Sequence, residues 1–302
     1  MGQGHAEFMR AKRTTFKTTL VPTLLLAPQL LITFVFFVWP SVQAIWQSVL
    51  REDAFGTKTQ FVGMANFARL AADPTYLASA GVTVFFSLAV GILSLALGLL
   101  FAALTDHVAR GKAAYRMLLV WPYALAPAVA AVLWFFIFNP TVGVGSGVLR
   151  AMGIAWNPQL NGTHALWLCI ISATWKQVSY NFLFFLAGLQ AIPKSLIEAS
   201  SLDGAGGILR FRTIVFPLLM PTTFFLLVVN MLYAFIDTFG IIHATTGGGP
   251  GQATSTLVFR VYRDGFEGLD LGISAAQSVI LLLVIGTLTV LQFRYIERRV
   301  EY

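Results

Sequence analysis

Residues 81–104 read GVTVFFSLAVGILSLALGLLFAAL, and this stretch decides the fold class of the chain. It contains no charged residue. At a rise of 1.5 Å per residue, a helix of this length is about 36 Å long, enough to cross roughly 30 Å of hydrocarbon. The stretch therefore predicts a membrane-spanning helix.

Five other stretches have the same character. The six predicted spans are residues 20–39, 81–104, 117–138, 165–189, 215–236 and 274–293. Hydrophobic residues make up 57% of the 302 residues and charged residues only 11%, against about 25% charged in an average soluble domain. We therefore expect an all-α membrane protein, with six transmembrane helices forming a single domain over residues 1–302 and the lipid bilayer as its surroundings.

The basic residues predict the orientation of these spans. Thirteen lie on one side: Arg10, Lys12, Arg13, Lys17, Arg110, Lys112, Arg116, Lys194, Arg210, Arg212, Arg294, Arg298 and Arg299. Six lie on the other: Arg51, Lys58, Arg69, Arg150, Arg260 and Arg263. Because basic loops stay in the cytoplasm, both termini of this multi-pass chain are expected there. The net charge of +7 thus marks orientation rather than a nucleic-acid surface.

The cytoplasmic connection between the fourth and fifth spans, residues 193–214, is unusually structured. Ser195 and Glu198 have the spacing of a capping box, which predicts a short helix starting there. Asp203-Gly204 predicts its end, since glycine allows the positive φ of a sharp turn. A second helical stretch then leads into the fifth span, where Pro217 is tolerated near the start. Such a pair of short helices suits either a loop lying on the lipid headgroups or a docking site for a soluble partner.

The same loop resembles the EAA loop of ABC importer permeases. The residues that carry the resemblance are Glu198, Ala199, Ser200, Gly204, Ile214, Phe216 and Pro217. Ser200 stands in place of an alanine and Phe216 in place of a leucine. The resemblance implies that this loop, including Ser195 and Asp203, forms the coupling helix that docks into an ATP-hydrolysing subunit.

The likeness extends over nearly the whole chain to the sugar-permease group, and most closely to permeases of glycerol-3-phosphate importers. It is carried by residues 121–134, 175–185, 233–239, 248–254, 268–278 and 292–295. The resemblance implies the type I ABC importer permease architecture in a bacterial inner membrane. It also implies a second homologous permease subunit, two ATP-binding subunits and an extracytoplasmic solute-binding protein. The implied solute is glycerol-3-phosphate or a glycerophosphodiester, with a neutral sugar or oligosaccharide as the alternative.

Polar residues within the spans suggest a translocation path. Lys176 is the one basic residue inside a span, and an ionised lysine at that depth should face protein or water. The expected path residues are Lys176, Gln177, Tyr180, Asn181, Asn230, Tyr233 and Asp237. Lys176 could instead make a structural bond, and asparagines in spans also join helices. Ser94, Gly98 and Ala102 form a small-residue face that predicts helix packing.

The sequence offers no catalytic, cofactor-binding or metal-binding motif. No Gly-x-x-x-x-Gly-Lys-Ser/Thr loop is present, so ATP and Mg are expected to be used by a partner ATPase. The four histidines lack the spacing of metal ligands, and Cys169 is the only cysteine. An integral-membrane enzyme would need convergent catalytic groups, and an ion-coupled transporter would need carboxylates within spans. Neither pattern is seen, so a non-catalytic permease subunit is the favoured interpretation.

Overall fold

The computed structural model describes residues 20–52, 58–107 and 111–297. Some basic residues used for the predicted orientation lie outside the described residues: Arg10, Lys12, Arg13, Lys17, Arg110, Arg298 and Arg299. The elements, in chain order, are α1 (Leu20–Thr33), η1 (Phe34–Val38), α2 (Trp39–Ser48), β1 (Leu50–Glu52), β2 (Thr59–Phe61), α3 (Ala65–Ala72), α4 (Pro74–His107), α5 (Lys112–Val120), η2 (Trp121–Ala124), α6 (Pro127–Ile137), α7 (Val144–Ala151), α8 (Gly162–Ala191), α9 (Lys194–Leu202), α10 (Gly207–Arg210), η3 (Phe211–Val215), α11 (Phe216–Leu232), η4 (Tyr233–Asp237), α12 (Phe239–Thr245), α13 (Leu257–Tyr262), η5 (Arg263–Glu267) and α14 (Leu271–Glu297).

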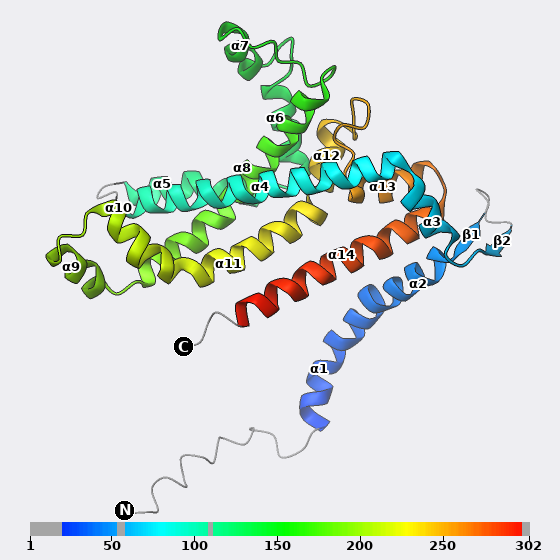
Figure 1. Ribbon diagram of the computed structural model, residues 1–302, viewed down its shortest axis with the longest axis horizontal. Coiled ribbons are helices and arrows are strands. Elements are labelled where there is room, and N and C mark those ends of the chain that lie inside the picture. Colours follow the sequence, from blue (N-terminus) through cyan, green and yellow to red (C-terminus); the bar gives the residue numbers. More distant parts are fainter. Residues whose placement is uncertain (1–19, 53–57, 108–110, 298–302) are drawn as a thin grey trace, which may run out of the picture.

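Long helices form the body of the molecule. In Figure 1, α4, α8, α11 and α14 run along the long axis. The turn carrying α9 and α10 and the start of α5 lie at one end, while the β1–β2 hairpin and α3 lie at the other. The start of α5 and the turn between α8 and α11 therefore lie at the same end of the molecule, as expected for two connections on one side of a membrane.

The crossing of α4 and α8 forms the centre of the fold. Ser94 and Ala102 are completely buried there. A Cβ placed on Gly98 would lie 2.5 Å from the Cβ of Asn181, so the two helices meet at van der Waals contact only because position 98 has no side chain. The predicted small-residue face on this helix is thereby confirmed as a packing surface.

The N-terminal helices are attached differently. The segments α1, η1 and α2 form one apolar helical run, and its second half, α2, packs against α14. In contrast, α1 diverges from the body in Figure 1, and its leucines remain exposed, Leu25 by 67%. Exposed apolar side chains of this size need lipid or another protein around them.

The predicted third span, residues 117–138, is not a single straight helix. The axis bends by 107° between the segment that ends at Ala124 and the helix that begins at Pro127. Ala126 is extended, with φ −60° and ψ 143°, because the ring of the following proline disfavours the helical conformation at the preceding residue. Consequently α6 rises away from the layer of long helices, with α7 beyond it (Figure 1).

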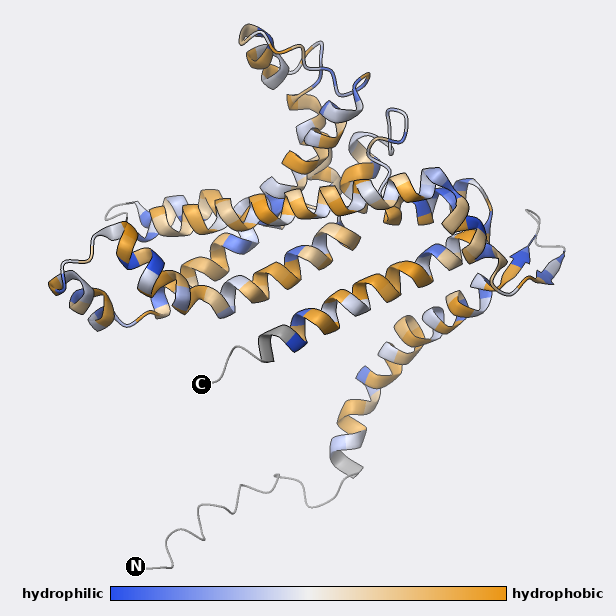
Figure 2. Cartoon of the chain, viewed as in Figure 1, coloured by the Kyte–Doolittle hydropathy of each residue, from blue (hydrophilic) through white to orange (hydrophobic). Residues whose placement is uncertain are grey.

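Hydropathy agrees with a membrane protein. Apolar residues dominate the long helices in Figure 2. Among the described residues, four helices are long and apolar enough to span a membrane, at Pro22–Ser48, Pro74–Asp106, Gly207–Asp237 and Leu271–Arg294. The number rises to six if two bent pairs, α5–η2 with α6 and α8 with α9, each count as one span.

An ion-pair cluster joins the junction between α3 and α4 to α13 and η5, at the end that carries the hairpin. The guanidinium of Arg260 is buried and lies 2.8 Å from the Asp73 carboxylate and 3.5 Å from that of Asp264. Burial alone would raise the pKa of Asp73, but hydrogen bonds from Thr75 and the charge of Arg260 outweigh it and hold this pKa below its usual value.

Candidate functional site

A cavity of about 640 Å³ lies between the bend of the third span, α8 and the α11–η4 helix. Its wall is formed by Tyr123, Pro127, Lys176, Gln177, Tyr180, Val229, Leu232, Tyr233 and Asp237. Five of the seven expected path residues therefore come together around one space. Its volume falls within the range of about 300–1,000 Å³ that is typical of small-molecule sites.

Lys176 occupies the middle of α8. It lies 14 residues after Gly162 and 15 before Ala191, so its Cα is about 21 Å from the start of the helix. Only 8% of the residue is exposed. The ammonium donates a hydrogen bond to the carbonyl oxygen of Tyr123 at 3.2 Å and lies 5.0 Å from the centre of the Tyr123 ring. A buried cation is thus held in place by a carbonyl and an aromatic face.

The Tyr123 carbonyl is free for this bond because of Pro127. In a continuous helix that carbonyl would accept from the backbone N–H four residues later, but proline has none. The break at Pro127 thus creates the acceptor that Lys176 uses. Tyr123 was not among the expected path residues, although Pro122 and Pro127 around it signal a break in the sequence.

Another part of the cavity wall lies on a π-helical segment. Tyr233 and Asp237 are the first and last residues of η4. Tyr233 is buried and its hydroxyl lies 3.4 Å from the carbonyl oxygen of Ala173, whereas Asp237 is exposed. Single-turn π-helices inside α-helices occur frequently at functional sites.

Asn181 and Asn230 have another position. Both are completely buried, and each amide donates to the side-chain oxygen of the other, at 3.1 and 2.9 Å. Ser94 donates to the same oxygen of Asn230 at 3.1 Å. These bonds join α4, α8 and α11. Asn181 and Asn230 are therefore not part of this cavity wall, and their place on the translocation path stays a prediction.

The expected coupling loop forms a turn at the end of the molecule (Figure 1). α9 is bent by 68° from α8, and Gly204, with φ +77°, ends it as predicted. Ser200 is buried and donates to the carbonyl of Ile197 at 2.7 Å, and Arg210 of the next helix donates to Ser201 at 2.9 Å. The Arg210–Ser201 bond links α10 to α9, whereas the Ser200–Ile197 bond lies within α9.

The surface of this turn is open. Glu198, Ala199, Asp203 and Pro217 are exposed, and Ile214 is half-buried. The apolar side chain of Leu202 is 90% exposed at the tip. A charged and apolar surface on a short rigid helix is suited to docking against a protein.

The predicted capping box is wrong. α9 begins at Lys194, one residue before Ser195, and its N-cap is Pro193, which offers no side-chain acceptor. Ile192 is extended with ψ 125°, as expected before a proline, so the proline rather than a serine cap fixes the start of this helix.

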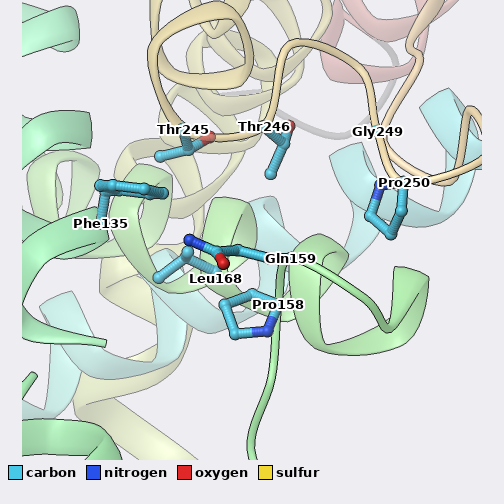
Figure 3. Close-up of a pocket in the computed structure, with 8 residues that line it drawn as sticks. All are labelled: Phe135, Pro158, Gln159, Leu168, Thr245, Thr246, Gly249 and Pro250. Carbon is cyan, nitrogen blue, oxygen red and sulfur yellow. The ribbon is translucent and has the colours of Figure 1, made fainter. Parts of the chain in front are cut away.

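A smaller cavity of about 230 Å³ lies beside the Gly-Gly-Pro loop (Figure 3). Gln159, Leu168 and Thr245 are among the residues drawn around it. The loop is held by a hydrogen bond between the hydroxyls of Thr246 and Thr254, whose oxygens are 2.7 Å apart. At this volume the cavity lies below the usual size of a small-molecule site.

Within residues 20–52, 58–107 and 111–297 no cluster of three or more histidine, cysteine or acidic residues could hold a metal ion. Cys169 is buried and bonds to the hydroxyl of Thr245 at 3.1 Å. Its role in the described structure is thus in packing.

Comparison with known families identifies the family of this chain. Residues 94–302 match the family described as the binding-protein-dependent transport system inner membrane component. The chain belongs to this family. It is a permease subunit of an ABC importer in the membrane, with the type I importer fold.

Individual members of the family are similar over almost the whole chain. The sn-glycerol-3-phosphate transport system permease protein UgpA of Brucella abortus biovar 1 is 59% identical over 291 residues, covering 96% of this chain and 99% of the relative. UgpA of Yersinia pseudotuberculosis serotype I is 52% identical over 294 residues, covering 97% and 100%.

Solved structures agree in fold. A bacterial ABC transporter involved in the import of the acidic polysaccharide alginate matches with a TM-score of 0.80 at 19% identity, covering 93% of this chain and 96% of that one. The MetNI methionine ABC transporter in an inward-facing conformation matches with a TM-score of 0.55 at 14% identity, covering 74% and 96%.

Proposed function

We propose that this chain is the transmembrane permease of an ATP-driven importer for sn-glycerol-3-phosphate or glycerophosphodiesters, and forms half of the solute path. The observation that carries the proposal is the identity of 52–59% to UgpA permeases over nearly the full length of both chains. The cavity supports it independently, because a buried lysine at mid-helix supplies the positive charge that a phosphate ester requires.

The importer would be a heteromeric complex. Its other members are a second homologous permease subunit, two ATP-binding subunits and an extracytoplasmic solute-binding protein. The similarity to a bacterial alginate ABC transporter in complex with an oligosaccharide-bound periplasmic protein supports this type of assembly, since that chain shares the fold with a TM-score of 0.77 at 19% identity. The permease itself is non-catalytic in this proposal, and ATP and Mg are used by the partner ATPase.

Coupling would pass through the turn formed by α9 and α10. When the ATPase dimer closes, it moves this turn as a rigid body and swings the spans between inward-open and outward-open states. The bond between Arg210 and Ser201 and the left-handed Gly204 support rigidity in the turn. Replacing Glu198 by lysine in the reconstituted complex should lower uptake while the ATPase subunits still hydrolyse ATP. Unchanged uptake in this variant would argue against a docking role for α9.

By this proposal both chain termini lie in the cytoplasm of a bacterium, on the same side of the membrane as α9. The basic residues Lys112, Lys194, Arg210 and Arg294 lie in connections and helix ends expected on that side. A reporter fused after residue 302 that is active only in the cytoplasm tests the orientation. An inactive reporter at this position, together with activity of a second reporter that works only outside the cytoplasm, would reverse the orientation.

A neutral sugar is the second candidate solute. The rings of Tyr123 and Tyr180 lie 5.7 Å apart beside the cavity, and aromatic faces of this kind also suit uncharged solutes. Uptake assays with labelled glycerol-3-phosphate and a labelled disaccharide distinguish the two. Uptake of the disaccharide alone would keep the importer and reject the phosphate ester, and uptake without ATP would favour an ion-coupled transporter.

A further inference from the structure

The cavity has opposite charges at separate places on its wall. Lys176 lies on α8 and Asp237 at the end of η4. The ion pairs formed within the described part of the chain include neither of them. A buried cation that is not paired with the nearby carboxylate is costly in a membrane, so the separation of the two charges needs a reason.

Each charged group has unused hydrogen-bonding capacity. The Lys176 ammonium has three donors and uses one on the Tyr123 carbonyl. No described side chain donates a hydrogen bond to the Asp237 carboxylate, which can accept several. The cavity therefore presents strong donors at one place and strong acceptors at another.

A solute that satisfies both places carries an anion at one end and hydroxyl donors at the other. A small phosphate ester of a polyol has this pattern. A phosphate dianion beside Asp237 would be repelled by the carboxylate, whereas beside Lys176 it gains charge-assisted hydrogen bonds, so only one orientation fits. Inorganic phosphate satisfies the lysine alone, and an uncharged sugar satisfies the carboxylate alone.

We propose that Lys176 binds the phosphate and Asp237 the hydroxyl end of one solute molecule, which fixes its orientation in the permease. This inference rests on the proposed function, because it assigns the two ends of the same phosphate ester. It also makes the permease itself selective. After the solute-binding protein releases the solute, the permease must recognise both of its ends.

The competing role for the two residues is a gate in which Lys176 and Asp237 attract each other in another state of the transporter. A double-mutant cycle separates the roles. If the two groups bind opposite ends of the solute, the losses from Lys176→Gln and Asp237→Asn multiply. If they bind each other, removing both charges restores much of the uptake lost with either one.

The experiment uses the complete complex in proteoliposomes, with ATP inside and with the solute-binding protein and labelled glycerol-3-phosphate outside. Lys176→Gln should lower kcat/KM for uptake by about tenfold to a hundredfold, and Asp237→Asn by about twofold to tenfold, from the usual values for charged and neutral hydrogen bonds. Lys176→Arg should retain more uptake than Lys176→Gln, because guanidinium also binds phosphate. Arg294→Gln removes the same charge from an exposed position and should leave uptake unchanged.

Stimulation of ATP hydrolysis by the loaded binding protein shows that each variant is assembled. Absence of glycerol-3-phosphate uptake by the unmodified complex would reject the proposed function. Two outcomes would overturn the inference but leave the proposed function, provided that the unmodified complex takes up glycerol-3-phosphate. One is equal uptake rates for Lys176→Gln and Arg294→Gln. The other is recovery of uptake in the Lys176→Gln, Asp237→Asn double variant. Should Lys176→Gln fail to assemble, the test rests on Asp237→Asn and Lys176→Arg.

Discussion

Replacing Gly98 by alanine tests the packing at the centre of the fold. The new Cβ would lie 2.5 Å from the Cβ of Asn181 and 3.2 Å from the backbone carbon of that residue. Carbon atoms in contact are normally about 3.5–4.0 Å apart, so α4 and α8 must separate by roughly 1 Å. Overpacking of this kind costs about 1–3 kcal/mol, which should lower the thermal midpoint by at least about 2 °C.

The assay is the thermal midpoint of the purified complex in detergent, followed by size-exclusion chromatography after heating. Gly81→Ala is the matched control, since it lies on the same helix and its Cβ would meet no atom within 4 Å. Alanine favours helix over glycine by about 1 kcal/mol, so the control should keep or raise the midpoint. If Gly98→Ala were as stable as Gly81→Ala, the described crossing of α4 and α8 would be wrong.

Three further outcomes are expected. Hydrogen bonds from Thr75 and the charge of Arg260 depress the pKa of Asp73, so this carboxylate stabilises the fold above pH 3.8 and the stabilisation is lost as the pH falls through the folded pKa. Asp73→Asn should therefore reduce the loss of thermal midpoint on acidification. An unchanged pH profile would contradict the ion pair with Arg260. Asn230→Leu removes the bonds that join three helices and should destabilise the permease by about 1–2 kcal/mol in a denaturation assay, so unaltered stability would contradict that network. Gly204→Val forces a β-branched residue to φ +77° and should lower the uptake per ATP hydrolysed. The control Gly206→Ala lies at φ −64° with no atom within 4 Å of the new Cβ and should leave this ratio unchanged. The same ratio in both variants would argue against a role for the turn at residue 204.

Apolar length and small-residue spacing predicted the main body of the fold. A continuous run such as residues 81–104 has one stable conformation in a bilayer, because an unpaired backbone amide there is too costly. The face formed by Ser94, Gly98 and Ala102 likewise predicted close packing. Both features depend only on residues that are close together in the sequence, so the sequence alone predicts them.

The bend in the third span needed more than local information. Residues 117–138 are apolar throughout, and hydropathy does not distinguish a straight helix from one that bends by 107°. Pro127 signals a break, but the direction of the new axis depends on the helices against which it packs. The start of α9 was misplaced for a related reason, since Pro193 fixes it before Ser195 can act as a cap.

The candidate site was predicted in part. Lys176 stands out as a lone charge in an apolar segment, and the structure places it on the cavity wall with Asp237. Its acceptor, the Tyr123 carbonyl, is a backbone group that becomes free only in the folded chain. Asn181 and Asn230 share the sequence signature of path residues, because a polar side chain in a span serves a ligand or a neighbouring helix equally well.

ATP-driven uptake by the purified complex tests whether this chain belongs to an importer of sn-glycerol-3-phosphate. The purified complex of this chain and its partner subunits is reconstituted with ATP inside the vesicles and with the solute-binding protein and labelled sn-glycerol-3-phosphate outside. Labelled sn-glycerol-3-phosphate should accumulate, accumulation should stop when ATP or the binding protein is omitted, and excess disaccharide should not reduce it. Accumulation without ATP, or of the disaccharide in place of the phosphate ester, would contradict the proposed function.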